Sequence, residues 1–581
     1  MYAFPYGIAN FEKIVEKGYF YIDRTNYIKK LEKTAETILF VRPRRFGKSL
    51  FLNMLGCYYD VKGNFEKYFG KLEIGKAPTE EKNRYLILSL DFSNVSGAGN
   101  LERIEENFHN YCNDCYKDFS RNYEKELKLE IEINKKFSDA SFNSLISSVN
   151  YSGYKLYVMI DEYDNFANEL MTTGKEEEYK KVTTGEGILK SFFKKLKAAE
   201  KGVIGKIFIT GVSPIVMTEM SSGFNIATNI SLDEEFNEMC GFTEEEVGNL
   251  LREILREQGA EKNWENHLEL MRLYYNGYRF SEDAERKIYN PTLALYFFRE
   301  LQERGNLPKS LCDLSLSMDM NKLEFLARIN SGQKALWEIV GEGKIEIKDI
   351  IRGFTYQELM HLERESKEHL ASFMYYFGLL TIKKADVNLI LEVPNKISYE
   401  LYLKKIGKMI LPEYQDFADI RRKMFQKGDM KTVAKFLEER FSELSNRDYI
   451  YNMKESGCKL MFLAIFHDSN LYLMESEPEI VRGYSDLLFI AREDKRNLNI
   501  LDFLIEFKYI GLGEIKKEGK DIRKMADAEL LAEPLVKEKI ETALEELKRY
   551  EEGLLKKHPR LALKKYIVVG IGFERILGLE I

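Results

Sequence analysis

The sequence predicts an α/β chain of several domains, and three observations carry this prediction. Short apolar runs alternate with amphipathic stretches in the first half, the middle is mostly helical, and the last part has a different order, α-β-β-β-α-β. The chain has 581 residues, which exceeds a single core at about 150 residues per domain. We expect three domains, over residues 1–235, 236–415 and 416–581, with a linker near 412–427.

The composition is that of an ordinary globular chain. Hydrophobic residues make up 44% and charged residues 31%, with 11 prolines, which excludes a collagen-like or wholly disordered chain. The 87 basic and 94 acidic residues give a net charge of -7, so any nucleic-acid contact must come from a local basic surface. Six cysteines do not make a disulfide scaffold. No signal-peptide pattern and no apolar run of roughly 18 residues is present, so we expect a cytoplasmic protein with no membrane partner.

Four apolar runs in the first half predict a parallel sheet covered by helices. Each run is short, unalternated and rich in β-branched or aromatic residues, as strands buried on both faces are. Amphipathic stretches such as 187–196 lie between the runs and predict the covering helices. The predicted strands span residues 37–41, 85–90, 156–160 and 206–210.

The middle region begins with a helix start at Thr243, where the sequence TEEE has the pattern of a capping box. From this residue onward, the middle region predicts mostly helices. Residues 370–380 predict a helix before a hairpin over 381–395, an order compatible with a winged-helix module.

The last part of the chain predicts a separate small domain. Two helices come first, at 430–444 and 447–466, and three strands come after them. The order is completed by a further helix and a last strand. These elements span 471–476, 484–491, 499–510, 536–551 and 565–573.

A phosphate-binding loop with one altered position comes directly after the first strand. The pattern asks for Gly, four residues, then Gly-Lys-Ser/Thr. RPRRFGKS keeps Gly47, Lys48 and Ser49, while Arg42 stands at the first glycine position. In such a loop the glycine lets backbone amides approach phosphate, the lysine reaches the β/γ oxygens, and the hydroxyl binds Mg²⁺ at a helix N-terminus. The alternative is a solvated turn at a helix start.

A second element, at the end of the third strand, favours a nucleotide site. Asp161 would hold Mg²⁺, and Glu162 would polarise the attacking water as a catalytic base. Two such elements, each directly after a buried strand, favour nucleotide binding over chance. Ser49 and Asp161 are then the metal ligands. We predict that ATP contacts Arg45, Phe46, Gly47, Lys48, Ser49, Leu50 and Asp161.

Other polar residues are open to two interpretations. Thr210 or Ser213, at the end of the fourth strand, is either a nucleotide sensor or a strand cap. Arg44 and Arg45 either face the γ-phosphate or are surface charges. Arg279, in the motif YYNGYRF, is either a nucleotide-contacting arginine or part of a packed helix end, and the second interpretation is favoured.

A group of carboxylates and a lysine lies in the C-terminal domain. Strand alternation in LIEFK places Glu506 and Lys508 on one face, and a hairpin can bring Asp486 beside Glu506. Asp486 and Glu506 would hold Mg²⁺ or Mn²⁺, which prefer oxygen ligands, and Lys508 would orient the attacking water or stabilise negative charge. With Glu455 on the preceding helix, this group predicts catalysis of phosphodiester hydrolysis. The alternative is a polar sheet face with an ordinary Glu–Lys pair.

With these residues in place, the chain resembles the bacterial family that joins an AAA-ATPase-like N-terminal domain to a C-terminal PD-(D/E)xK nuclease domain. The motifs that carry the resemblance run nearly from end to end: FPYGIANFEKIVEKGYFYIDRTNYIKKLE, RPRRFGKSLFLNML, IDEYDN, YYNGYRF, and the pair RGYSDLLF and LIEFKY. The family's loop also lacks the first glycine, so Arg42 is not necessarily damage. One departure is Glu546, which stands where such nucleases often carry a glutamine.

The resemblance implies a P-loop NTPase fold at the N-terminus and a restriction-endonuclease-like fold at the C-terminus. It implies ATP and Mg²⁺ as cofactors, with Mn²⁺ an alternative in the second site, and nucleic acid as the partner, DNA rather than RNA. The function expected is an ATP-regulated nuclease, in defence or mobile-element biology by analogy. The alternative is a nucleotide-switched module that binds nucleic acid or protein without cutting. A homo-oligomer is open in either case.

Overall fold

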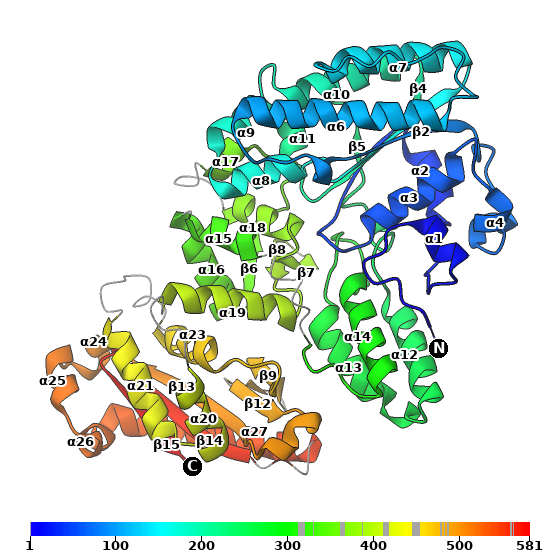
Figure 1. Cartoon of the computed structure of the whole chain (residues 1–581). Helices are drawn as coiled ribbons and strands as arrows, with labels where there is room; N and C mark the ends of the chain where they lie inside the picture. The colour runs from blue at the N-terminus through cyan, green and yellow to red at the C-terminus, as the bar shows by residue number, and fades with distance from the viewer. Residues whose placement is uncertain are drawn as a thin grey trace. The chain divides into compact units, whose positions relative to one another are not determined.

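The structure is a computed structural model, and it describes residues 2–311, 320–328, 330–360, 367–385, 387–410, 417–443, 454–476, 479–480, 483–484, 487–557, 561 and 563–581. The chain forms two compact units (Figure 1). The first unit is Met1–Asn306 with Ile345–Lys396, and the second is Leu307–Lys344 with Ile397–Ile581. The division into three domains remains a prediction. In the described part of the chain, no helix has the length and apolar character needed to cross a membrane.

The first unit is built on a five-stranded parallel sheet. Its strands are β1 Thr37–Val41, β2 Tyr85–Asp91, β3 Lys155–Asp161, β4 Ile204–Gly211 and β5 Thr228–Asn229. Their order is β2-β3-β4-β1-β5, and the four predicted runs each form one of these strands, so the predicted parallel sheet is confirmed. Because the strands are parallel, their carboxyl ends meet at one edge, where β1 ends beside β4 and β2 ends beside β3.

Helices surround this sheet, and all five residues of β1 are buried. The helices are α1 Phe11–Glu16, α2 Tyr27–Thr34, α3 Lys48–Tyr59, α4 Phe65–Phe69, α5 Glu73–Lys76, α6 Leu101–Asn122, α7 Ser138–Ser152, α8 Asn165–Thr173, α9 Glu176–Thr183, α10 Ile188–Glu200 and α11 Ile215–Glu219. α3 packs against β2 and β3, and α10 packs against β4. The apolar residues of α10 recur at helical spacing, so one face of this helix enters the core.

Three further helices of the first unit come after the sheet: α12 Glu244–Glu257, α13 Trp264–Tyr275 and α14 Pro291–Arg304. The predicted capping box is confirmed, because the Thr243 hydroxyl accepts from the Glu246 N–H and the Glu246 carboxylate accepts from the Thr243 N–H. The Asn290 side chain caps α14, whose first residue is a proline. α12 packs against both α13 and α14.

The first unit also contains a small module with the winged-helix order. Its elements are β6 Lys344–Ile347, α17 Tyr356–Met360, α18 Lys367–Tyr376, β7 Thr381–Ala385 and β8 Leu389–Glu392. The sheet order is β6-β8-β7, with the two helices between the first strand and the β7–β8 hairpin. The expected helix and hairpin are therefore present, and the helix ends at Tyr376 rather than at residue 380.

A mixed five-stranded sheet forms the centre of the second unit. Its strands are β9 Tyr472–Ser476, β12 Leu487–Ala491, β13 Asp502–Ile510, β14 Leu563–Ile571 and β15 Arg575–Glu580, in the order β15-β14-β13-β12-β9. β13 and β14 are parallel, and the other neighbours are antiparallel. The helices that pack against this sheet are α21 Met430–Glu443, α23 Lys454–Phe466 and α27 Pro534–Lys557. The predicted α-β-β-β-α-β order is confirmed.

The described residues of the second unit also form shorter elements and four other helices. α24 Leu512–Ile515, α25 Gly519–Lys524 and α26 Asp527–Ala532 connect β13 to α27. The other helices of the described part of this unit are α15 Met320–Arg328, α16 Asn330–Glu342, α19 Lys396–Ile410 and α20 Ala418–Lys427. The linker expected near 412–427 is wrong over its second part, because α20 occupies it and buries one apolar face. Residues 411–416 lie outside the described part of the chain.

The edge strand β15 is one that the sequence pattern does not predict. Gly578 interrupts its apolar run, and glycine is unfavourable in strands. In the structure Gly578 lies against Met430 and Ala434 of α21, so closely that an added Cβ would overlap their atoms. Close packing of a helix on this strand therefore explains the glycine.

Candidate functional site

The phosphate-binding loop connects β1 to α3 and turns through two left-handed residues. Gly47 has φ 91° and Arg45 has φ 69°, so a side chain at position 47 would be strained. α3 begins at Lys48, which presents the first N–H groups of a 12-residue helix to the loop. A helix N-terminus of this kind attracts phosphate through its N–H groups and its dipole.

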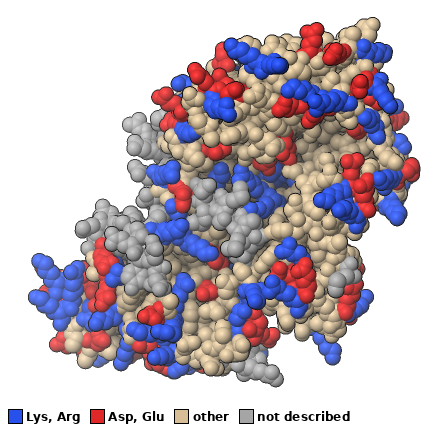
Figure 2. Space-filling model, viewed as in Figure 1, with Lys and Arg blue, Asp and Glu red and all other residues tan. Residues whose placement is uncertain are grey.

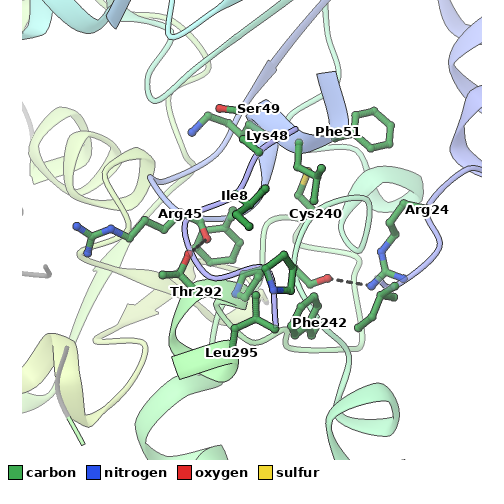
Figure 3. A pocket seen from close by; sticks show the side chains of 18 of the residues that line it. Ile8, Arg24, Arg45, Lys48, Ser49, Phe51, Cys240, Phe242, Thr292 and Leu295 are labelled. Carbon is green, nitrogen blue, oxygen red and sulfur yellow. Dashed lines mark hydrogen bonds between the residues drawn. The ribbon is translucent and has the colours of Figure 1, made fainter. Parts of the chain in front are cut away.

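Four predicted site residues meet at the carboxyl edge of the sheet. Lys48 Nζ lies 3.3 Å from Glu162 Oε1 and 3.3 Å from the Pro43 carbonyl oxygen. Ser49 is hydrogen-bonded to the Asp161 carboxylate. Lys48 is buried, and its ion pair with Glu162 offsets part of the lost hydration. Figure 3 shows Lys48 and Ser49 side by side at the start of α3.

Ionisation of the Asp161 carboxylate is unfavourable in free energy in this environment. Burial raises the pKa of Asp161 to about 6, against the hydrogen bond from Ser49. The charge of Glu162 adds to this rise, and the charge of Lys48 opposes it. A buried carboxylate with too little positive charge around it, beside a hydroxyl and a lysine, suits a divalent cation bound to nucleotide phosphates. The residues therefore fit the predicted Mg²⁺ and ATP.

We expect Asp161→Asn to stabilise the protein at neutral pH in the absence of nucleotide and metal. A pKa raised from 3.8 to about 6 means that the folded state binds this proton more tightly than the unfolded state. Ionisation above about pH 6 then costs up to about 3 kcal/mol of folding free energy, which asparagine does not incur. Urea unfolding of both proteins at several pH values measures the difference, which should shrink as the pH falls from 6 towards 4. A variant less stable than wild type at neutral pH would contradict this.

Glu162 occupies a left-handed turn directly after β3. Its φ is 47°, a conformation that costs a residue other than glycine about 1–2 kcal/mol. The Asn165 N–H closes the turn by donating to the Glu162 carbonyl oxygen at 2.9 Å. Such strain persists where surrounding contacts fix the backbone, and here it holds the Glu162 carboxylate at the edge of the sheet beside Lys48.

Tyr163 and Asp164, which the sequence analysis does not single out, tie this turn to the neighbouring strand. Asp164 is fully buried, and its carboxylate accepts hydrogen bonds from the backbone N–H groups of Val212 and Ser213. The Tyr163 hydroxyl donates to the Ser213 carbonyl oxygen at 2.6 Å. The two residues thus fix the loop after β4 relative to the end of β3. The second aspartate in IDEYDN, which is Asp164, is the one sequence signal at this position, and it does not by itself show which groups the residue binds.

The structure also places the polar residues that the sequence left open. The Ser213 hydroxyl lies 3.4 Å from the Asp164 carboxylate, so it belongs to the same tie. Thr210 is fully buried at the end of β4. The Arg44 guanidinium donates to the Asn165 side chain at 2.7 Å, at the start of α8.

Arg42 has a structural explanation at the position where the loop pattern has glycine. Its side chain is buried and donates to the carbonyl oxygens of Val41, Ser231 and Phe236 at 2.9, 2.6 and 2.9 Å. Its guanidinium carbon also lies 4.3 and 4.2 Å from the ring centroids of Phe40 and Phe280. The arginine therefore holds the end of β1 to two distant segments of the first unit.

We expect Arg42→Ala to destabilise the protein by about 3–5 kcal/mol, because three buried carbonyl oxygens lose their donor and a cavity remains. Arg44→Ala is the matched control, since Arg44 is only partly buried and has a single described hydrogen bond. Its loss should cost about 1 kcal/mol or less. Urea unfolding of the first unit, followed by circular dichroism, measures both. Equal stability of the two variants would show that the Arg42 contacts do not hold the unit together.

A cavity of about 290 Å³ opens beside the loop, within the first unit. The loop residues from Arg45 to Leu50 all line it. Its other walls include the apolar side chains of Ile8, Phe242 and Leu295, which come from three separate segments (Figure 3). A phosphate-binding loop that continues into an apolar cavity has the form that a nucleoside triphosphate requires.

Two of the predicted nucleotide contacts have side chains directed elsewhere. Phe46 is buried, and its ring packs edge-on against Tyr278 and Phe280 with centroid distances of 4.8 and 5.2 Å. Its contribution to the cavity therefore comes from its backbone. In Figure 3 the Arg45 side chain extends away from the other labelled side chains, while its carbonyl oxygen accepts a hydrogen bond from Thr292. Nucleotide contacts by both residues remain predictions.

In the second unit, Glu506 and Lys508 of β13 meet Glu546 of α27. Lys508 Nζ lies 3.0 Å from Glu506 Oε1 and 2.7 Å from Glu546 Oε2. Glu506 is almost wholly buried, whereas the other two side chains keep some exposure. The structure therefore joins the residue that departs from the family pattern to two of the predicted catalytic residues.

These contacts fix the charges of the group. Burial acts to lower the pKa of Lys508, but the contacts with Glu546 and Glu506 outweigh it and hold that pKa above its ordinary value. Burial acts to raise the pKa of Glu546, but the hydrogen bond that it accepts from Lys508 outweighs burial and holds that pKa below its ordinary value. An ammonium in this position can stabilise developing negative charge and cannot accept a proton. The Glu506 and Glu546 carboxylates both contact the Lys508 ammonium, and carboxylate oxygens are also the ligands that Mg²⁺ and Mn²⁺ prefer.

The two other predicted residues are placed less fully. The hairpin of β12 and β13 is confirmed by the register that pairs Leu487 with Ile505, but Asp486 lies outside the described residues. Glu455 is half-buried at the start of α23, the helix that packs against β13. Among the residues that the structure describes, no three His, Cys, Asp or Glu side chains gather into a metal site.

The fold and the two sites define the class of protein. It joins a P-loop ATPase-like unit to a second unit, whose mixed sheet is like that of the PD-(D/E)xK nucleases. Comparison with protein families agrees. Residues 5–221 match the family model described as a predicted AAA-ATPase, and residues 453–579 match the model of the PD-(D/E)XK nuclease superfamily. The chain therefore carries one domain of each kind, and the resemblance and the fold class predicted from the sequence are confirmed.

Individual relatives are more distant. The uncharacterized protein in the vnfD 5' region of Azotobacter chroococcum mcd 1 is 27% identical over 302 residues, which is 52% of each chain, so this chain spans about half the length of that relative. The Walker-type ATPase of Pyrococcus abyssi has a TM-score of 0.39 and 13% identity, covering 65% of this chain and 94% of its own. Cdc6p of Pyrobaculum aerophilum has a TM-score of 0.26 and 10% identity, covering 68% and 98%.

Proposed function

We propose that this protein binds and hydrolyses ATP in its first unit and, with a divalent metal, cleaves phosphodiester bonds of nucleic acid in its second unit. The observation that carries the proposal is that one chain holds both groups of residues. Lys48 lies with Glu162 at the phosphate-binding loop, and Glu506 lies with Lys508 on β13. The two family matches support the same pair of activities.

In the first unit the residues have separate parts in this proposal. The N–H groups at the start of α3 and the Lys48 ammonium would bind the phosphates, while Ser49 and Asp161 would hold Mg²⁺, which would supply charge neutralisation at the phosphate oxygens. Glu162 accepts a proton from the attacking water at its carboxylate. Lys48 and Glu162 are paired to each other in this structure, so a phosphate that takes Lys48 as its partner leaves the Glu162 carboxylate available as the base.

In the second unit Asp486 and Glu506 would hold Mg²⁺ or Mn²⁺, which polarises the phosphate and lowers the pKa of bound water. Lys508, kept as an ammonium by Glu546, stabilises the negative charge that develops on the phosphate oxygens. Glu455 is proposed as a further acidic residue of this site, on the helix that packs against the strand of Glu506.

A local basic surface supports nucleic acid as the partner. Because the net charge of the chain is -7, contact with nucleic acid requires such a surface. Lys516, Lys520 and Lys524 are exposed around α25. Figure 2 shows lysine and arginine side chains gathered over this part of the second unit. Because α24 and α25 come after the carboxyl end of β13, this surface lies directly beyond the strand that carries Glu506 and Lys508. We propose DNA rather than RNA and a role in defence or mobile-element biology on the resemblance alone, with homo-oligomerisation open. The cytoplasmic location stays a prediction from the sequence.

A cleavage assay tests the proposal. Plasmid, linear and single-stranded DNA and an RNA of the same sequence are incubated with wild type, Lys508→Ala and Lys564→Ala, with Mg²⁺ or Mn²⁺, with and without ATP. Lys564 is the matched control, an exposed lysine of the same unit that pairs with Glu580. Cleavage by wild type and Lys564→Ala, but not by Lys508→Ala, supports the proposal. No cleavage of any substrate under any condition refutes its nuclease part.

A second candidate function is a nucleotide-switched module that binds nucleic acid or protein without cutting. The observation that favours it is Glu546, whose carboxylate engages Lys508 at 2.7 Å where related nucleases often carry an uncharged glutamine. Tight ATP binding with slow turnover, together with no cleavage in the assay above, would support this function.

A further inference from the structure

From Leu370 to Tyr376, the second helix of the winged-helix module in the first unit has no face that could enter a groove of nucleic acid. Every residue of α18 from Leu370 to Tyr376 is buried, whereas a helix that enters a groove needs an exposed face. The end of this helix is held from inside the module, because Ser372 and Tyr376 both hydrogen-bond to the backbone of Ile351. The contacts of the module within the first unit are therefore the ones that indicate its role.

Residues 276–280, called here the coupling segment, contact the phosphate-binding loop. The Phe46 ring packs edge-on against the rings of Tyr278 and Phe280. The Arg42 guanidinium lies 4.2 Å from the centroid of the Phe280 ring. Two residues of the loop therefore rest on two rings of the coupling segment, so a shift of the loop backbone cannot leave the segment unaffected.

The same segment contacts the winged-helix module. The Arg279 N–H donates to the Thr381 hydroxyl at 2.8 Å, and the Arg279 guanidinium donates to the Lys383 carbonyl oxygen at 2.6 Å. The Phe280 ring also lies 6.4 Å from the ring of Tyr375 in α18. Both hydrogen bonds reach β7, so the segment holds the first strand of the hairpin as well as the helix.

Two glycines allow unusually close backbone approach on these paths. Gly277 has φ 111°, and a Cβ there would overlap the carbonyl oxygen of Pro394. Gly378, at the end of α18, has φ 73°, and a Cβ there would come within 2.7 Å of the Pro43 side chain in the phosphate-binding loop. The Asn395 side chain adds a hydrogen bond of 3.0 Å to the Asn276 carbonyl oxygen.

The ends of the module are the places where the chain passes between the two units. It enters the first unit after Lys344, at the start of β6, and leaves it after Lys396, next to the residues that contact the coupling segment. We propose that the coupling segment transmits the nucleotide state of the phosphate-binding loop to the winged-helix module and, through it, to these two connections. This inference rests on the proposed function, because it takes ATP as the ligand of the loop. The event that starts it is the exchange of the Lys48–Glu162 ion pair for a contact between Lys48 and phosphate.

Hydrogen exchange of the full chain, read by mass spectrometry with Mg²⁺ and either ATP, ADP or no nucleotide, tests this inference without requiring cleavage. In wild type, ATP is expected to change exchange by at least twofold at 42–50, at 276–280 and at 381–396. In Arg279→Ala the change at 42–50 should persist, and the change at 381–396 should be lost. Thr381→Val, which removes the hydroxyl that accepts from Arg279, should act in the same direction with little effect on folding.

Arg286→Ala is the matched control. Arg286 is an exposed arginine near the same segment, and its described ion pair with Glu238 is long, at 3.8 Å, so this variant should respond like wild type. Exchange changes at 42–50 without any at 381–396 in wild type would overturn the coupling and leave ATP binding standing. An Arg279→Ala response equal to that of wild type would also overturn the coupling. The absence of any change at 42–50 in wild type would overturn the proposed ATP binding and the coupling together.

Discussion

Lys48→Ala is expected to weaken ATP binding by about 100-fold or more, which is roughly 3 kcal/mol. Lys48 is a buried cation at the phosphate-binding loop, 3.3 Å from Glu162. Without it, the carboxylates of Glu162 and Asp161 remain at the edge of the sheet, and their repulsion of the triphosphate is no longer balanced. Isothermal titration calorimetry of ATP with Mg²⁺ measures the change.

Lys30→Ala is the matched control for this variant. Lys30 is a partly exposed lysine of the same unit, on α2, with an ion pair of 3.5 Å to Glu235. Its replacement should leave ATP affinity within about twofold, because exposed ion pairs contribute little. Folding of Lys48→Ala has to be checked by urea unfolding, since the change leaves the Glu162 carboxylate without its cation. A folded Lys48→Ala that binds ATP as wild type does would contradict the assignment of the loop.

Glu506→Gln is expected to lower the rate of phosphodiester cleavage by about 1000-fold, roughly 4 kcal/mol in the barrier. Glu506 is the buried carboxylate of the group on β13 and the proposed metal ligand. An amide has nearly the same shape and removes the negative charge that the metal requires. Rates with Mn²⁺ on a fluorescent DNA substrate, under single-turnover conditions, measure the loss.

Two neighbouring substitutions on α27 serve as controls for Glu506→Gln. Glu545→Gln makes the same change of charge on an exposed residue and should leave the rate within about twofold. Glu546→Gln restores the residue that related nucleases often carry and still offers Lys508 an acceptor, so it should retain cleavage. If Glu506→Gln cuts as fast as Glu545→Gln, the metal is held elsewhere.

The parts of the fold that the sequence predicts are those with a local cause. The strands at 37–41 and 156–160 are recognisable because they are apolar on both faces, and the capping box at Thr243 needs only its own four residues. Strand β15 cannot be predicted in this way, because the reason for its glycine is the packing of a helix that lies more than a hundred residues earlier. Helix α20 is also not predicted, because its sequence is mostly charged and its apolar residues form only one face.

The candidate sites divide in the same way. The nucleotide-site residues are predictable because a few consecutive residues define each of the strand, the loop and the helix start. These residues are Lys48, Ser49, Asp161 and Glu162. The role of Arg42 is not predictable, since two of its three acceptors lie 189 and 194 residues further along the chain, and no local pattern connects them to it.

Sequence alone does not assign a role to residues that come together only through tertiary packing. Asp164 is acidic and comes shortly after a charged pair, so its sequence context does not show that it is a buried anchor for Val212 and Ser213. The role of Glu546 likewise depends on α27 packing on β13, which places its carboxylate beside Lys508. The resemblance singles out position 546, and the structure shows its contact with Lys508.

The interleaving of the two units along the chain has a consequence for proteolysis and truncation. The chain passes between the units three times, after residues 306, 344 and 396, so a single cut at any one passage releases neither unit. A gene fragment that starts at residue 416 would lack α15, α16 and α19, which belong to the second unit. The second unit can be separated from the first only by removing residues 1–306 and also excising residues 345–396, which include the winged-helix module. Its natural boundary is therefore set by packing and not by position in the gene.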